Sequence, residues 1–160
     1  MITDFLLEHS ALVPVALLAL AVACVGVGIL ILRAGRQDVL RALVVLSALP
    51  VIALTLVPAS GGLGVRHCEV QFSLPTLGSV ELLANVALLF PLTFFAALAT
   101  RRPLLVLVGA TALSAAIEAV QALLPAIARS CDTNDWAMNT AGAVVATSLA
   151  AALLVRDRAA

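Results

Sequence analysis

Residues 11–32 read ALVPVALLALAVACVGVGILIL, a run of 22 residues without a charged side chain. A helix that crosses the roughly 30 Å hydrocarbon layer of a bilayer needs about 20 apolar residues, so this run predicts a transmembrane helix. A cleaved signal peptide is not expected, because the chain starts with Asp4 and Glu8 rather than with a basic segment. The fold class then depends on whether the rest of the chain is equally apolar.

The composition shows that the whole chain is strongly apolar. Of the 160 residues, 63% are hydrophobic and 11% are charged, and the mean hydropathy is +1.17. Soluble domains contain about 45–50% apolar and about 25% charged residues, so this chain has too few polar groups to cover a globule in water. Nine arginines balance nine acidic residues, which leaves no basic excess for nucleic-acid binding. The composition therefore predicts an integral membrane protein.

Further apolar runs give the number of spans. The continuous runs lack the alternation of a membrane β-barrel, so the predicted fold class is all-α. We expect a single membrane domain, residues 1–160, and Pro91 should kink its third helix. Five transmembrane helices are predicted, at about 11–32, 42–58, 81–100, 103–124 and 136–155.

The arginines predict how these helices are oriented. Seven of the nine fall on one side of the five-helix arrangement, and only Arg66 and Arg129 fall on the other. Positively charged loops stay in the cytoplasm, so the sequence predicts an external N-terminus and a cytoplasmic C-terminus. Two loops, at about 59–80 and 125–136, are then external. The first contains residues 70–74, whose alternating pattern fits either a short strand or an interfacial segment.

Each external loop contains one cysteine, Cys68 in the first and Cys131 in the second. An oxidising exterior permits a disulfide between them, provided that their Cα atoms come within about 7 Å. Two free thiols are an alternative. A metal site that adds His67 and Asp132 is another, although no tight spacing of metal ligands is present. We expect no resident metal or cofactor.

Polar side chains inside the predicted spans lie at a similar depth. Glu118 is the only charged residue within a span, and burying a charge costs roughly 2.5–3.5 kcal/mol, which makes it a candidate catalytic residue. Ser114 and Gln121 share its helix face through the i, i+4, i+7 spacing. At 1.5 Å per residue, Asn85, Glu118 and Asn139 fall about 5–10 Å below the outer boundary. The candidate ligand-binding residues are Asn85, Ser114, Gln121, Arg129, Asp135 and Asn139.

These residues also have structural interpretations. Asn85 and Asn139 could hydrogen-bond across helices, which contributes about 0.6–2 kcal/mol each. Glu118 could be protonated and bonded to those amides. Arg129 could form a salt bridge with Asp132 or Asp135 at the rim, which contributes little. An ionisable group inside a membrane is nevertheless a functional hypothesis by default.

Two segments in the second half of the chain contain longer motifs. Residues 85–91 read NVALLFP, and residues 114–142 contain S-x-x-x-E-x-x-Q followed by Arg129, Asp135, Asn139 and Gly142. They resemble the N-x-x-L-F-x-P element and the S-x-x-x-E-x-x-Q element, with its following R, D, N and G, of VanZ-like membrane proteins. A glycine usually present after the first element is missing. The resemblance covers residues about 80–146.

The resemblance implies a multi-pass protein in the cytoplasmic (plasma) membrane of a bacterium, as part of the cell envelope. The family takes its name from an accessory protein of glycopeptide-resistance clusters that raises resistance to teicoplanin. From the composition and the polar residues, we expect membrane lipids and an envelope lipid or cell-wall precursor as partners, and no nucleic acid. The resemblance supplies a context and a set of positions, and it does not supply a reaction.

Two main hypotheses of function follow. In the first, the protein binds an anionic envelope lipid or cell-wall precursor, whose phosphate or carboxylate pairs with Arg129 while the buried polar side chains hold the head group. In the second, it is an intramembrane enzyme that acts on a lipid-linked substrate with Glu118 as general acid or base. A proton-coupled transporter is a third option, less favoured because five helices show no internal repeat.

Overall fold

The computed structural model describes residues 10–58, 68–74, 76 and 78–159. Within these ranges, five helices are long and apolar enough to cross a membrane, which confirms the predicted all-α class and the predicted number of spans. The spans are Ser10–Arg33, Gln37–Leu56, Val80–Thr100, Pro103–Leu123 and Thr133–Arg158.

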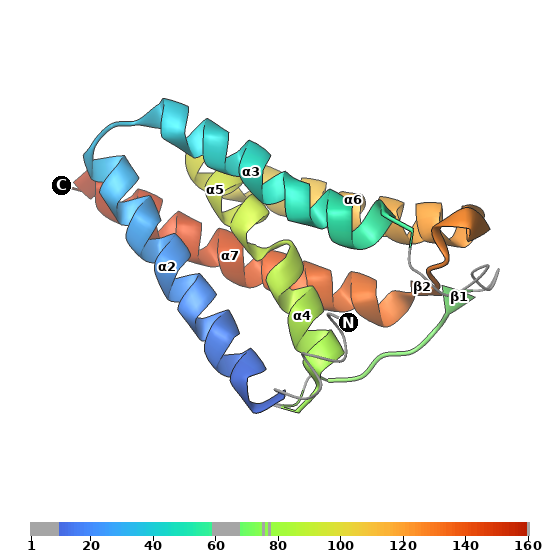
Figure 1. The fold of residues 1–160 in the computed structure, drawn as a ribbon. Helices are drawn as coiled ribbons and strands as arrows, with labels where there is room; N and C mark the ends of the chain where they lie inside the picture. Colours follow the sequence, from blue (N-terminus) through green and yellow to red (C-terminus); the bar gives the residue numbers. More distant parts are fainter. Residues whose placement is uncertain (1–9, 59–67, 75, 77, 160) are drawn as a thin grey trace.

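The elements follow one another along the chain in a simple order (Figure 1). The first two spans consist of η1 (Ser10–Leu12), α2 (Val13–Arg33) and α3 (Gln37–Leu56). The last three consist of α4 (Val80–Leu88), α5 (Phe90–Thr100), α6 (Pro103–Leu123) and α7 (Thr133–Ala159). The short strand β1 (Cys68–Glu69) lies between α3 and α4, and η2 (Pro125–Ile127) and β2 (Cys131–Asp132) lie between α6 and α7.

The observed helices extend beyond some of the predicted bounds. The predicted second helix starts at residue 42, whereas α3 starts at Gln37, and the predicted fifth helix ends at residue 155, whereas α7 continues to Ala159. Charge-free windows locate the part of a helix that can lie in hydrocarbon. They do not locate its ends, because a helix can continue through charged residues into the interfacial layer.

The third span is interrupted, as Pro91 suggested. The helix breaks at Leu89, where α4 ends and α5 begins, and Pro91 occupies the first turn of α5. Proline has no N–H to donate, and its ring clashes with the carbonyl four residues earlier, so a continuous helix is disfavoured at this point. The chain resumes helical bonding at Thr93, whose N–H donates to the Leu89 carbonyl at 3.0 Å.

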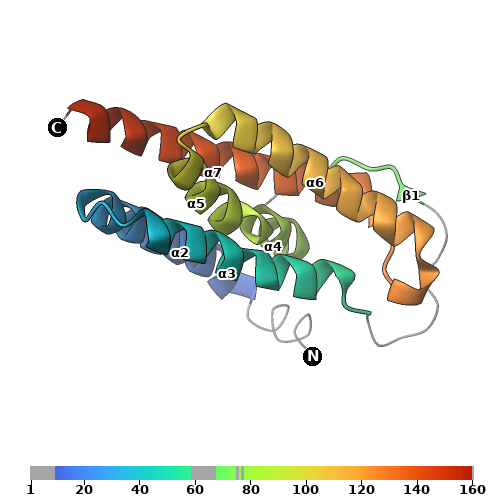
Figure 2. The ribbon, with the colours of Figure 1, turned by 90° about the horizontal axis from the view of Figure 1, so that it is seen from above.

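Helix α7 lies at the centre of the packing, against α4, α5 and α6 (Figures 1 and 2). Its Gly142, Ala146 and Ala150 recur at every fourth position, and all three are buried. Small residues in this pattern let backbones approach closely, which matters because helices in lipid associate through van der Waals packing rather than through the hydrophobic effect. Phe90 and Phe94 of α5 belong to the same buried cluster as the two alanines.

Most of the arginines lie at one end of the molecule, at or near the helix connections. The α2–α3 turn, the α5–α6 turn and the end of α7 lie at one end of the molecule (Figures 1 and 2), where Arg101 forms a 2.8 Å salt bridge with Asp157. The strands β1 and β2 lie at the opposite end, which we call the strand end. Which end is cytoplasmic stays a prediction from the positive-inside rule. Asp4, Glu8 and Arg66, which contribute to it, lie outside the described residues.

The contact between α4 and α7 makes Gly142 sensitive to substitution. A Cβ at Gly142 would collide with the backbone carbonyl of Val86, and backbone moves less readily than a side chain. We expect Gly142→Ala to destabilise the fold by about 1–3 kcal/mol through overpacking. The measurement is the midpoint of thermal unfolding in detergent. Gly109→Ala is the control, since nothing lies within 4 Å of a Cβ there; equal midpoints for the two variants would contradict the packing.

Candidate functional site

A polar pocket of about 300 Å³ lies where α3, α4, α6 and α7 meet, near the strand end. Glu118 lies five residues before the end of α6 and Asn139 six residues after the start of α7. At 1.5 Å per residue, both side chains are therefore about 7–9 Å from those helix ends. Six of the seven candidate residues line the pocket: Asn85, Glu118, Gln121, Arg129, Asp135 and Asn139.

Ser114, the seventh candidate, is not among the lining residues. It lies one turn deeper on α6 and is fully buried, at 0% exposure. Its hydroxyl oxygen accepts a 3.1 Å hydrogen bond from Nδ2 of Asn139. The other polar atom of that amide, Oδ1, is buried and has no hydrogen-bond partner among the described residues. A buried acceptor without a partner costs about 1–3 kcal/mol, so this atom is poised to accept a hydrogen bond.

Glu118 connects α6 to the start of α7. The side chain is 7% exposed, and its Oε2 accepts a 2.9 Å hydrogen bond from the backbone N–H of Asp132. Asp132 is also the N-cap of α7, because its Oδ1 accepts a 2.8 Å bond from the N–H of Asn134. Oε1 of Glu118 has no hydrogen-bond partner in the described part of the chain, so one carboxylate oxygen holds the scaffold while the other is unused.

Asn85 and Asp135 join α4 to α7. Nδ2 of Asn85 donates a hydrogen bond to Oδ1 of Asp135. Glu81, one turn earlier on α4, also lines the pocket, although sequence analysis did not select it. Glu81 and Asp135 lie in the first turns of α4 and α7, where the helix dipole stabilises negative charge.

Gln121 and Arg129 both donate hydrogen bonds to the end of α3, a role that the sequence did not reveal. Nε2 of Gln121 donates to the Thr55 carbonyl at 3.0 Å, and Nε of Arg129 donates to the Val57 carbonyl at 3.3 Å. The last carbonyls of a helix have no donor within the helix, so donors from elsewhere stabilise them. Arg129 forms no salt bridge with Asp132 or Asp135 in the structure.

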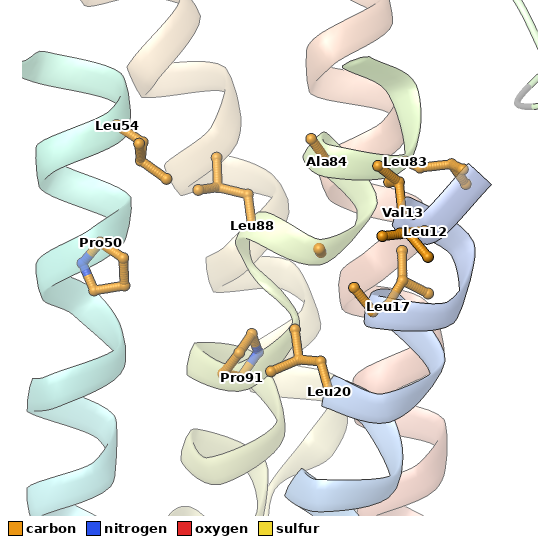
Figure 3. A pocket seen from close by; sticks show the side chains of 12 residues that line it. Leu12, Val13, Leu17, Leu20, Pro50, Leu54, Leu83, Ala84, Leu88 and Pro91 are labelled. Atoms are coloured by element: carbon orange, nitrogen blue, oxygen red, sulfur yellow. The ribbon is translucent and has the colours of Figure 1, made fainter. Parts of the chain in front are cut away.

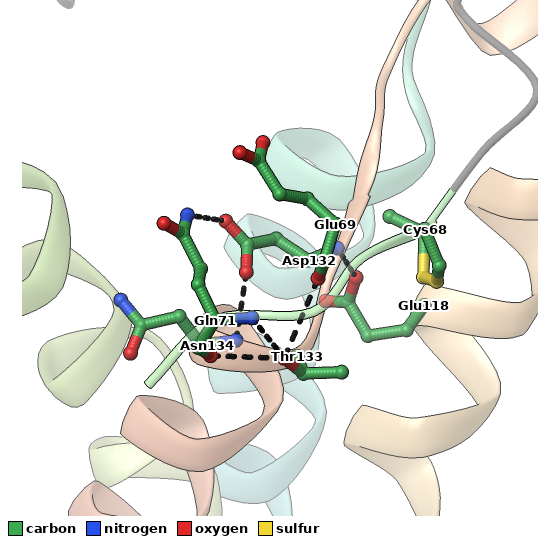
Figure 4. Close-up of a disulfide and its surroundings, with 8 residues drawn as sticks. Cys68, Glu69, Gln71, Glu118, Asp132, Thr133 and Asn134 are labelled. Carbon is green, nitrogen blue, oxygen red and sulfur yellow. Dashed lines mark hydrogen bonds between the residues drawn. A yellow bond between two sulfur atoms is a disulfide. The ribbon is translucent and has the colours of Figure 1, made fainter. Parts of the chain in front are cut away.

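Of the alternatives left open for the two loop cysteines, the structure contains the disulfide. Cys68 and Cys131 are joined, with Cα atoms 4.5 Å apart, and lie opposite each other in the parallel pair of β1 and β2 (Figure 4). The bridge joins β1 to β2 at the strand end and lies beside Glu118. It also uses both cysteines of the alternative metal site, whose His67 lies outside the described residues. Elsewhere in the described ranges, no group of three or more His, Cys, Asp or Glu side chains could hold a metal ion.

After β1 the chain runs extended along the first turn of α7. The backbone N–H of Gln71 donates to Oγ1 of Thr133 at 3.0 Å, and that hydroxyl donates to the Gln71 carbonyl at 2.9 Å. Ser73 continues the pattern with a 3.0 Å bond from its N–H to Oδ1 of Asn134. The alternating segment, residues 70–74, is thus not a strand itself but an extended segment that follows the two-residue strand β1 and is hydrogen-bonded to α7 (Figure 4).

Comparison with known proteins adds one match. A model of the VanZ/LLP1 family matches residues 15–155. The match extends from α2 to α7, so it includes the first two spans as well as the segment about 80–146 that contains the motifs. Neither the curated proteins nor the solved structures gave a match.

The disulfide can be tested by counting thiols. Under denaturing conditions without reductant, we expect an alkylating reagent to modify Cys24 alone, because Cys68 and Cys131 are bonded to each other. After reduction, all three cysteines should be modified. Intact-mass spectrometry counts the added groups. Three modified cysteines before reduction, in protein prepared without reductant, would contradict the bridge.

Proposed function

Because the chain belongs to the VanZ/LLP1 family, we propose that it is a bacterial cytoplasmic-membrane protein that binds an anionic envelope lipid or cell-wall precursor in its polar pocket. The observation that carries the proposal is that the polar pocket shares a wall with a separate apolar cavity. Three residues line both of them: Leu54, Ala84 and Leu88.

The apolar cavity has a volume of about 490 Å³ and lies between α2, α3 and the α4–α5 break (Figure 3). This volume falls within the range of about 300–1,000 Å³ that is usual for ligand pockets. Leu17 and Leu20 line it from α2, and Pro50 and Pro91 line it from α3 and α5. Nearly all of its lining is hydrocarbon, so it suits an acyl or isoprenoid chain.

The two neighbouring spaces fit the two parts of one amphiphile. The head group would occupy the polar pocket and one chain the apolar cavity, with Leu54, Ala84 and Leu88 at the boundary. A chain that leaves the bilayer for an apolar cavity exchanges one hydrocarbon environment for another, so it gains no hydrophobic free energy. Selectivity must therefore come from hydrogen bonds and charges in the polar pocket.

Arg129 is suited to the anionic part of the head group. Its Nε is held by the Val57 carbonyl, and its terminal nitrogens have no partner among the described residues. A guanidinium fixed in this way presents a fork of donors that matches a phosphate or carboxylate. Hydrogen bonds of this charge-assisted kind contribute about 1.5–3 kcal/mol.

The enzyme hypothesis is the second candidate, supported by the unused Oε1 of Glu118. A reaction would also need a nucleophile or an activated water. Ser114 is fully buried outside the pocket, and the hydroxyl of Thr55, which does line it, donates to the Val51 carbonyl at 2.6 Å. Neither hydroxyl is placed to attack a substrate. This arrangement favours binding over catalysis.

The link to glycopeptides follows from the family context. If the protein sequesters or displays a lipid-linked precursor, expression should raise teicoplanin resistance in a sensitive host. We expect Arg129→Gln to abolish the increase, because losing about 1.5–3 kcal/mol weakens binding by roughly 10–100-fold. Arg102→Gln, at the opposite end of the molecule, is the control. The measurement is the minimum inhibitory concentration at matched membrane levels, and an unchanged value with wild type would contradict the link.

Glu118→Gln separates the two candidate functions in the same assay. Glutamine keeps an acceptor for the Asp132 N–H but cannot exchange a proton at working pH. Full resistance with Glu118→Gln would contradict the catalytic hypothesis. Loss with Glu118→Gln and retention with Glu118→Asp would favour an ionising role.

The apolar cavity can be tested by filling it. Ala16 lines the cavity from α2, so Ala16→Phe should occupy much of the space that a chain would need. We expect this variant to lose most of the lipid that copurifies with wild type, because the chain no longer fits. Ala112→Phe, on the exposed side of α6 and outside the cavity, is the control. Mass spectrometry of lipid extracts gives the amount per protein, and equal retention would contradict a specific chain site.

A further inference from the structure

The polar pocket has more negative charge than an anionic ligand would favour. Three carboxylates line it, those of Glu81, Glu118 and Asp135, against the single guanidinium of Arg129 among the described lining residues. Glu81 and Asp135 lie in the first turns of α4 and α7. A head group that was only anionic would therefore meet repulsion over most of the pocket.

The pocket also has unused hydrogen-bond acceptors. Asn139 lines the pocket and is only 2% exposed, and its Oδ1 has no hydrogen-bond partner among the described residues. Oε1 of Glu118 and Oδ2 of Asp135 likewise have no hydrogen-bond partner among the described residues. Asn85 and Gln121 each already use one amide N–H, toward Asp135 and the Thr55 carbonyl. The three unpaired oxygens can therefore accept donors from a ligand.

A bound metal ion does not account for this arrangement. The described residues contain no group of three or more carboxylate, histidine or cysteine side chains close enough to hold a metal. An ammonium group differs from a metal ion in its requirements. It has three N–H donors and accepts a mixture of carboxylate and amide oxygens at hydrogen-bond distance.

We propose that the ligand of the polar pocket is a lipid whose head group carries a primary ammonium group beside its phosphate. Asp135, Glu118 and Asn139 supply the acceptors for the ammonium group, and Arg129 binds the phosphate. This inference rests on the proposed function: it keeps the anionic phosphate for Arg129 and changes the class of lipid from anionic to zwitterionic. The head group then has a positive part for the carboxylates and a negative part for the guanidinium.

The test uses three lipids with identical dioleoyl chains: phosphatidylethanolamine, N-acetyl phosphatidylethanolamine and phosphatidylglycerol. N-acetylation removes the positive charge but keeps the phosphate and both chains. The full-length protein is purified in detergent and incubated with equal amounts of the three, and retained lipid is measured by mass spectrometry. Wild type should retain at least about tenfold more phosphatidylethanolamine than either competitor, the ratio that corresponds to about 1.4 kcal/mol.

Substitution of Asp135 locates the ammonium site. Asp135→Asn keeps the shape of the side chain and removes its charge, so it should reduce the preference for phosphatidylethanolamine to near parity. Glu69→Gln, an exposed carboxyl in β1 that does not line the pocket, is the matched control and should keep the preference. If Asp135→Asn does not fold, Glu118→Gln replaces it, and the comparison of the three lipids with wild type stands without any variant.

The outcomes separate this inference from the proposed function. If wild type retains the three lipids equally but more than Ala16→Phe does, the ammonium site is overturned and the lipid site stands. If wild type retains no more of any lipid than Ala16→Phe, the proposed function fails. Excess soluble phosphoethanolamine should not displace the bound lipid. Complete displacement would overturn the lipid as the source of the ammonium group.

Discussion

The hydrogen bond from the backbone N–H of Asp132 to the carboxylate of Glu118 determines the geometry of the site. It fixes the end of α6 to the residue that caps α7, at the point where the chain must reverse direction. Next to it, the disulfide and the β1–β2 pair attach the segment that leads to α4. Three helices of the polar pocket are therefore positioned by one small set of interactions at the strand end. Burying a carboxylate at membrane depth costs free energy. The hydrogen bond from the Asp132 N–H offsets part of that cost.

The cavities follow from two departures from regular helix packing. Gly142 lets α7 come close to the backbone of α4, which brings Asn85 within hydrogen-bond reach of Asp135. The break at Leu89 then turns α5 away from the direction of α4, and the space left beside Pro91 becomes part of the apolar cavity. Close contact on one face of the third span and a break within it thus place a polar pocket and an apolar cavity side by side.

The sequence predicts the spans well because the solvent imposes a simple rule: about 20 apolar residues per crossing, with charges at the ends. It also predicts which polar side chains converge, because depth along alternating helices follows from residue counts. It does not predict that Gln121 and Arg129 bind carbonyls at the end of α3, since neither the register between α3 and α6 nor the unpaired carbonyls are visible in a pattern of residue types. Glu81 is missed for a related reason. An acidic residue in a first turn is ordinary, and only the packing of α4 against α7 turns it toward a pocket.

Structural and functional interpretations of the polar residues do not exclude each other. Three polar side chains of the pocket bind the scaffold with one atom and leave another unpaired among the described residues: Nδ2 and Oδ1 of Asn139, Oε2 and Oε1 of Glu118, Oδ1 and Oδ2 of Asp135. A group held by one bond is already oriented, so a ligand loses less conformational entropy when it binds to the other atom. The same arrangement explains why deletion of such a side chain is uninformative, because it removes the scaffold bond together with the ligand bond. Only changes that keep the shape and one of the two bonds, such as carboxylate to amide, distinguish a residue that binds from a residue that merely packs.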